Sequence, residues 1–245
     1  MQSGAPDADG VTLRVTPADA GWSYVGFEVR RIAGRVELRE ARRETCVVLL
    51  SGSCALNGLG EGARETVFDG PPLALYVPPD TTWWAEGDAE LALCTAPAAG
   101  GLEPRLLDSP TLLTRGEGVE ERRIANILME DEPAESLLVT EVITPAGHWS
   151  SFPPHKHDVD DLPREALLEE TYYHRLRDGA GFAFQRVYTD DRSLDEAVPV
   201  QDRDLVLVPR GYHPVSNGTR HDLYYLNVMA GPHRKWVSTD DPDYA

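Results

Sequence analysis

The sequence predicts an all-β protein with two β-barrels in one chain, and three observations support this fold class. Apolar residues occur in many short runs, turn-forming residues separate the runs, and a pattern in the first half recurs in the second. The chain has 245 residues. Two barrel units of roughly 100–120 residues each would account for this length.

The short apolar runs are more typical of strands than of helices. Many are rich in Val, Tyr, Phe or Leu, and they are too short for a helix, which needs about ten residues or more with a 3.6-residue period. The sequence also contains 19 Pro and 21 Gly, which supply turns between strands. Many short strands with frequent turns indicate a sandwich or a barrel. The clearest runs are Cys46–Leu50, Leu73–Val77, Leu91–Thr95, Leu137–Ile143, Phe182–Tyr188, Leu205–Pro209 and Leu223–Met229.

An internal repeat predicts where the two barrels divide. Glu44-Thr45 precedes an apolar run and a glycine, and Glu170-Thr171 precedes a similar run. Residues 73–79 (LALYVPP) resemble residues 205–210 (LVLVPR) at nearly the same separation, about half the chain. We therefore predict an N-terminal barrel over residues 1–115 and a C-terminal barrel over residues 116–245, joined in the loop-like segment 100–118.

Charge and composition argue against several classes of partner. The net charge is −18 and the pI about 4.7, so the chain repels nucleic-acid backbones and anionic membranes. No apolar run approaches the roughly 20 residues that cross a bilayer, and the first residues lack the pattern of a signal peptide. The three cysteines, Cys46, Cys54 and Cys94, form no close pair. We expect a cytoplasmic protein with neither a nucleic acid nor a membrane as partner.

Histidine is distributed unevenly, and its distribution predicts one metal site. All seven histidines lie between residues 148 and 233. His155 and His157 are two residues apart, so on a strand both imidazoles point to one face. Glu170 begins a later strand-like run, and His213 follows a strand end and a turn. Glu169 competes with Glu170, but Glu170 shares a strand face with Tyr172 and His174. We predict that His155, His157, Glu170 and His213 hold one divalent ion.

Three imidazoles and one carboxylate suit several first-row metals. Zn, Mn, Fe, Co and Ni all accept such a ligand set, so the pattern leaves the identity of the metal open. An ion with open positions can polarise a carbonyl and an adjacent hydroxyl. The ligand set therefore predicts metal-assisted chemistry in the C-terminal barrel and none in the N-terminal barrel.

The series of two histidines, an acid and a later PxGxH resembles the two motifs of the cupin superfamily. Longer strings resemble one cupin family more closely, the 5-deoxy-glucuronate isomerases of myo-inositol breakdown. The segment 159–168, between the histidines and the acid, is longer than the usual cupin spacing. The strings are SSFPPHKHD (150–158), LEETYYHRL (168–176), GFAFQRVYTDD (181–191), DLVLVPRGYHPVS (204–216), YYLNVMAGP (224–232), GWSYVGFEVRRI (21–32) and GEGVEERRIANIL (116–128).

The resemblance implies a fold, a reaction and a substrate. The fold is a bicupin of two jelly-roll barrels with metal ligands in the second only, and it matches the distribution of histidine. The reaction is an aldose–ketose isomerisation of 5-deoxy-D-glucuronate to 2-deoxy-5-keto-D-gluconate. The partner is then a small sugar acid. Cupins often pair through strand edges, so a homodimer is an additional expectation.

The sequence offers several residues for the remaining roles and does not decide between them. A group must carry a proton between C2 and C1 unless a hydride shifts directly; the candidates are Tyr172, His174, Tyr188 and Tyr225. The substrate carboxylate needs a cation. Arg186 is the candidate, provided that its strand face, which it shares with Phe182, Phe184 and Tyr188, points into the barrel.

Three other functions remain open from the sequence. The first is an isomerase of the 4-deoxy-5-keto uronate released from pectin, a related family that shares the ligand set. The second is an iron or copper dioxygenase, which cupins also build from three histidines and a glutamate. The third is a barrel that binds or stores a sugar without catalysis.

Overall fold

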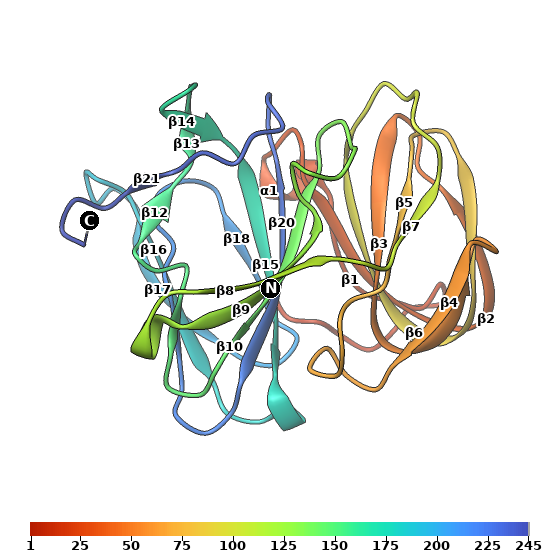
Figure 1. Cartoon of the computed structure of the whole chain (residues 1–245), viewed down its shortest axis with the longest axis horizontal. Helices are drawn as coiled ribbons and strands as arrows, with labels where there is room; N and C mark the ends of the chain where they lie inside the picture. The colour runs from red at the N-terminus through yellow and green to blue at the C-terminus, as the bar shows by residue number, and fades with distance from the viewer. Residues whose placement is uncertain (245) are drawn as a thin grey trace.

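The computed structural model describes residues 1–244 and confirms the all-β prediction (Figure 1). Two barrels lie side by side, the N-terminal one coloured red to yellow and the C-terminal one green to blue. In residues 1–244 the only α-helix is α1 (Pro17–Ala20), and two 3-10 turns, η1 (Gly118–Glu120) and η2 (Arg177–Gly179), join strands. No helix in this part of the chain is long and apolar enough to span a membrane.

The N-terminal barrel is one antiparallel sheet of seven strands. The order of strands is β1-β2-β6-β3-β5-β7, with β4 beside β3. The predicted runs Cys46–Leu50 and Leu91–Thr95 are the buried parts of longer strands, because the outer parts of these strands carry exposed polar residues. The strands are β1 (Val11–Val15), β2 (Gly26–Arg39), β3 (Arg43–Leu56), β4 (Gly60–Arg64), β5 (Ala74–Val77), β6 (Thr82–Pro97) and β7 (Arg105–Leu107).

The C-terminal barrel contains two larger sheets with a shared core. A six-stranded sheet has the order β18-β15-β20-β10-β9-β8, and a four-stranded sheet has the order β11-β19-β16-β17. Tyr172 and Val142 of the first sheet pack against Val187 and Val215 of the second. The strands are β8 (Thr111–Arg115), β9 (Arg122–Leu128), β10 (Leu138–Thr144), β15 (Glu169–Leu176), β18 (Leu205–Val208) and β20 (Leu223–Ala230), then β11 (Trp149–Ser150), β16 (Ala183–Tyr188), β17 (Asp195–Val200) and β19 (Val215–Asn217).

Two small strand pairs lie beside these sheets and shape the region of the predicted ligands. β12 (His155–Lys156) pairs with β21 (Thr239–Asp240), so the C-terminal segment holds the first histidine in place. β13 (Asp158–Asp161) pairs with β14 (Glu165–Leu167). The long spacing between the histidines and the acid is therefore a hairpin, which leaves His157 and Glu170 close together in space.

The sequence repeat has a structural counterpart. β3 pairs with β5 and β6 as β15 pairs with β18 and β20, with Thr45 opposite Val77 and Thr171 opposite Leu207. The predicted division after residue 115 falls at the end of β8. The chain passes from the seven-stranded sheet of the N-terminal barrel to the six-stranded sheet of the C-terminal barrel earlier, between β7 and β8. By hydrogen bonding, β8 therefore belongs with the C-terminal barrel.

The central strands are buried on both faces, which explains why their sequences are unbroken apolar runs. On β20, Leu226 and Val228 pack in a core that β3 of the other barrel shares through Val48 and Leu50. Tyr225, which precedes Leu226 and lies on the opposite face of the strand, points into its own barrel. A strand covered on both faces needs apolar residues at successive positions rather than at alternate ones.

Two glutamates join the barrels at equivalent places. Each carboxylate accepts three successive backbone N–H groups from the other half of the chain. Glu44 receives those of residues 135–137 at 2.7–2.9 Å, and Glu169 receives those of residues 23–25 at 2.6–2.9 Å. The repeat in the sequence aligns Glu44 with Glu170, but in its contacts Glu44 resembles Glu169.

Candidate metal centre

The predicted ligands come from three separate segments that the fold brings together. His155 lies on β12, and His157 precedes the β13–β14 hairpin; Glu170 lies near the start of β15. His213 follows the turn after β18. At Gly211 in this turn φ is +87°, and a Cβ atom would lie 2.3 Å from the carbonyl oxygen of Tyr188. Only glycine fits there, and it allows the chain to return His213 to the barrel interior.

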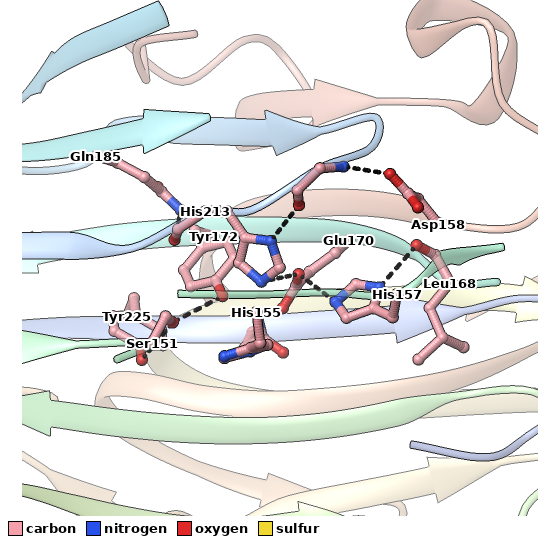
Figure 2. Close-up of polar contacts among 12 residues, drawn as sticks. Ser151, His155, His157, Asp158, Leu168, Glu170, Tyr172, Gln185, His213 and Tyr225 are labelled. Carbon is pink, nitrogen blue, oxygen red and sulfur yellow. Dashed lines mark hydrogen bonds and ion pairs between the residues drawn. The ribbon is translucent and has the colours of Figure 1, made fainter. Parts of the chain in front are cut away.

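Three of the four side chains converge on one point. The Nε2 atoms of His157 and His213 lie 2.8 Å and 3.0 Å from the same oxygen, Oε2 of Glu170 (Figure 2). All three residues are buried, and their ligand atoms lie within 4.8 Å of one another. Such a group of nitrogen and oxygen donors is typical of a transition-metal site.

Backbone carbonyls favour the form of each histidine that can bind a metal. Nδ1 of His157 lies 3.2 Å from the Leu168 carbonyl oxygen, and Nδ1 of His213 lies 2.9 Å from that of Gly211. A carbonyl only accepts, so Nδ1 carries the proton and the Nε2 lone pair faces Glu170. In residues 1–244 the buried His213 Nε2 has no hydrogen-bond partner of good geometry. The donor set thus fits a cation among Nε2 and carboxylate atoms.

The charge states of two of the four predicted ligands, Glu170 and His155, agree with this fit. Burial opposes the charged form of Glu170, but His213 and His157 outweigh it and hold the pKa of this carboxyl well below its usual value. Burial, with the neighbouring His213 and His157, lowers the pKa of His155 to about 3. Glu170 is therefore anionic and His155 neutral at pH 7, as metal ligands must be. Asn227 Nδ2 donates to the other oxygen of Glu170 and orients it.

His155 lies beside the group of three and not within it. Its ring centroid is 4.9 Å from that of His213 and 6.5 Å from that of His157. Its Nδ1 lies 3.1 Å from the Pro153 carbonyl oxygen, and the residue lines the neighbouring cavity. The possible metal site is thus built from His157, Glu170 and His213, and the role of His155 as a fourth ligand stays a prediction.

Glu169 and Glu170 have different partners, and a pair of variants distinguishes their roles. Because Glu169 caps three backbone N–H groups, Glu169→Ala should lower the free energy of unfolding by about 2 kcal/mol or more and leave the bound metal in place. Glu170→Gln keeps the shape of the side chain and should lose the metal. Urea unfolding and metal analysis of both variants would test this; loss of metal from Glu169→Ala alone would reverse the assignment.

A cavity of about 250 Å³ opens beside the ligand group. Its wall includes His155, Glu170, Tyr172, Ser151 and Tyr225. The Ser151 hydroxyl lies 3.0 Å from that of Tyr172 and 3.4 Å from that of Tyr225 (Figure 2). Burial, with the neighbouring Glu170, raises the pKa of Tyr172 well above its usual value. The cavity therefore brings Glu170 of the ligand group and the neighbouring His155 together with a connected set of hydroxyls.

Two other candidates for the proton carrier lie outside this cavity. Tyr188 donates to Asp241 at 2.6 Å and packs against Tyr212. His174 is fully buried behind Tyr172, on whose ring it stacks at 5.9 Å, and its Nε2 lies 3.0 Å from Gln185 Oε1. The structure thus brings Tyr172 and Tyr225 to the cavity and leaves His174 and Tyr188 away from it.

The burial of His174 predicts a loss of stability in acid. Burial lowers its pKa from 6.5 to about 4. The unfolded chain therefore binds a proton more readily between these two values, so this contribution to stability is complete above pH 6.5 and falls by up to about 3 kcal/mol as the pH approaches 4. Urea unfolding with a chelator present should show a smaller loss for His174→Gln than for the wild type; equal losses would contradict this role.

The expectation that Arg186 points into the barrel is wrong. On β16 the inward residues are Ala183, Gln185 and Val187, and Arg186 alternates with them on the outer face. Its guanidinium forms two hydrogen bonds with Asp195 at 2.8 Å and 2.9 Å. Arg186 therefore makes an exposed ion pair and does not reach the cavity.

Several residues of the cavity were not predicted from the sequence. Ser151 and Asn227 contact the site, and Arg115 and Arg122 lie in the wall of the cavity. The sequence does point to Asn227, because this residue is polar and lies in the middle of an apolar strand. The sequence carries no such signal for the two arginines, because their strands, the edge strand β8 and its neighbour β9, are mixed in composition.

The chain is similar to known proteins over its whole length. Residues 1–245 match the KduI/IolB family. The 5-deoxy-glucuronate isomerase of Geobacillus kaustophilus is 49% identical over 100% of this chain and 93% of its own length. That of Bacillus subtilis strain 168 is 43% identical over 96% of this chain and 92% of its own length.

Solved structures confirm the fold. The crystal structure of an IolB-like protein from Salmonella typhimurium LT2 is 43% identical, has a TM-score of 0.93 and covers 100% of this chain and 98% of that one. A mutant of Bacillus subtilis oxalate decarboxylase has a TM-score of 0.66 at 13% identity, over 98% of this chain and 79% of that one. This second likeness concerns the fold alone and supports the predicted arrangement of two cupin barrels.

Proposed function

This chain belongs to the KduI/IolB family, and on that basis we propose that it converts 5-deoxy-D-glucuronate to 2-deoxy-5-keto-D-gluconate in myo-inositol breakdown. The observation that carries the proposal is full-length identity of up to 49% with 5-deoxy-glucuronate isomerases, together with a buried group of two histidines and a glutamate at a small cavity. The enzyme is an isomerase.

The reaction moves hydrogen within one molecule and needs no second substrate. A proton leaves C2, and its electron pair forms a C1–C2 double bond as the aldehyde oxygen becomes a hydroxyl. The C2 hydroxyl then loses its proton to become a ketone, and C1 gains a proton to become a CH₂OH group. The active site must therefore hold and return one carbon-bound proton and redistribute those of two oxygens.

The ligand group supports the charge that develops on these oxygens. His157, Glu170 and His213, with His155 beside them, would hold a divalent ion, whose identity among Zn, Mn, Fe, Co and Ni is open. Such an ion, when bound, polarises the C1 carbonyl and the C2 hydroxyl and stabilises negative charge on them. Asn227 fixes the orientation of Glu170 by its hydrogen bond, which keeps the ligand set in place before substrate arrives.

The hydroxyls in the cavity supply the proton path in this proposal. Tyr172 lies in the cavity wall with Glu170, and Ser151 connects it to Tyr225. We assign this exchange to Tyr172. Its phenol gives its proton to the C1 oxygen, and the phenol oxygen takes up the proton that leaves C2. The phenol then delivers that proton to C1 and takes the proton of the C2 hydroxyl, with Ser151 and Tyr225 orienting the group. The ring of Tyr172 is fixed by His174 and Tyr225, whose centroids lie 5.9 Å and 4.8 Å away.

Parallel assays on two uronates test the proposed substrate. Purified protein of known metal content is incubated with 5-deoxy-D-glucuronate or with the 4-deoxy-5-keto uronate of pectin breakdown, and loss of substrate is followed by NMR. We expect conversion of the first at a kcat/KM at least 100-fold above that of the second. Conversion of the pectin product alone would assign the chain to the other activity within the family. The homodimer and the cytoplasmic location stay predictions.

A further inference from the structure

Two arginines share one wall of the cavity. Arg115 on β8 and Arg122 on β9 are directly opposite each other in the antiparallel pairing of these strands, and both line the cavity that contains Glu170 and Tyr172. Side chains directly opposite on neighbouring strands lie on the same face of the sheet. The fold thus places two positive charges side by side at the site.

Neither arginine has an acidic partner within 4.0 Å in residues 1–244, although the chain contains 41 acidic residues and only 23 basic ones. Arg122 donates to the Glu120 carbonyl oxygen at 3.1 Å. The Arg115 guanidinium lies 5.7 Å from the centroid of the Trp236 ring. Like charges directly opposite on a sheet are unfavourable. In so acidic a chain, such a pair without a carboxylate suggests that an anion from outside the chain neutralises it.

The surroundings of Arg122 strengthen this argument. Arg122 is partly buried, and burial, with the neighbouring Arg115, lowers the pKa of its guanidinium. A cation in a partly dry site costs free energy unless an anion accompanies it. Arginine binds carboxylates through two parallel hydrogen bonds, which favours this residue type over lysine for a carboxylate ligand.

We propose that Arg122, assisted by Arg115, binds the carboxylate of the sugar acid and so selects uronates over neutral sugars. The identity of this sugar acid is taken from the proposed function, and to that extent the inference rests on it. It gives the cavity two ends: the His157, Glu170 and His213 group faces the aldehyde, and the arginine pair receives the carboxylate. It also replaces Arg186, which lies on the outer face of the barrel.

Variants of Arg122 test the proposal on two substrates of the metal-loaded enzyme. The substrates are 5-deoxy-D-glucuronate and 5-deoxy-D-glucose, which has CH₂OH in place of the carboxylate. Arg122→Gln should lower kcat/KM for the acid by about 10- to 100-fold, mostly through KM, and change that for the neutral sugar less than about threefold. Arg122→Lys keeps the charge and should lose less. Arg220→Gln, at an exposed arginine outside this cavity, is the matched control and should behave as the wild type.

A binding measurement makes the test independent of turnover. The probe is the alcohol made by reducing 5-deoxy-D-glucuronate at C1, and its affinity is measured by calorimetry for the wild type and the three variants. Weaker binding by Arg122→Gln, with a smaller loss in Arg122→Lys and none in Arg220→Gln, supports the proposal even if the wild type fails to isomerise the acid, in which case only the proposed function is wrong. Equal losses on the acid and the neutral sugar, or unchanged affinity for the probe, would overturn it.

Discussion

His213→Ala should abolish metal binding and lower kcat by at least about 10³-fold, because a bound ion stabilises several kcal/mol of developing charge and each 1.36 kcal/mol is a factor of ten. His213 is fully buried, and its Nε2 lies 3.0 Å from Glu170 Oε2. Without it, only Glu170 and His157 of the converging group remain, with His155 beside them, and this reduced set holds a divalent ion poorly. Metal analysis and initial rates check this result.

His233→Ala is the matched control for this variant. His233 is an exposed histidine of the same barrel that lies outside the ligand group, so the same substitution there should change neither metal content nor rate. Far-ultraviolet circular dichroism would show whether His213→Ala keeps its strands. A His213→Ala protein that retains one metal per chain, or a kcat within tenfold of the wild type, would contradict the assignment of this ligand.

Tyr172→Phe should lower kcat by about 10²- to 10³-fold while KM and metal content change little, since a positioned acid or base contributes about this factor. The change removes only the hydroxyl that lies 3.0 Å from Ser151 and keeps the ring stacked on His174. Initial rates at several substrate concentrations separate kcat from KM.

Tyr188→Phe removes a hydroxyl outside the cavity, which bonds to Asp241, and should leave kcat within about threefold of the wild type. The reaction in D₂O adds a second measurement. A proton held on Tyr172 exchanges with solvent, so deuterium should enter the product at C1. Complete absence of deuterium, together with a Tyr172→Phe enzyme of normal kcat, would instead favour a direct hydride shift.

The sequence was sufficient to predict the fold and to select three residues that converge in the structure. Short runs of strand-forming residues, frequent turns and a repeat of half the chain predict two barrels, and the structure has them. The spacing of His157, Glu170 and His213 is recognisable because each residue type is rare in a strand interior and has few roles there. Their convergence within 4.8 Å agrees with that prediction.

The substrate end of the cavity could not be predicted in the same way. On β16 both faces carry apolar residues, so alternation alone does not show which face is inward; Phe184 and Arg186 point outward, and Gln185 points inward. The pairing of Arg115 with Arg122 depends on the register of β8 and β9. A pattern in one strand cannot specify that register, because turn geometry and tertiary packing determine it.

We propose that the chain has one metal-dependent isomerase site, in the C-terminal barrel. The most direct test is to remove metal with a chelator and to titrate a divalent ion back while measuring isomerisation of 5-deoxy-D-glucuronate. We expect no activity in the depleted protein and full activity at one equivalent of metal per chain. Full activity without metal, or a need for two equivalents per chain, would contradict it.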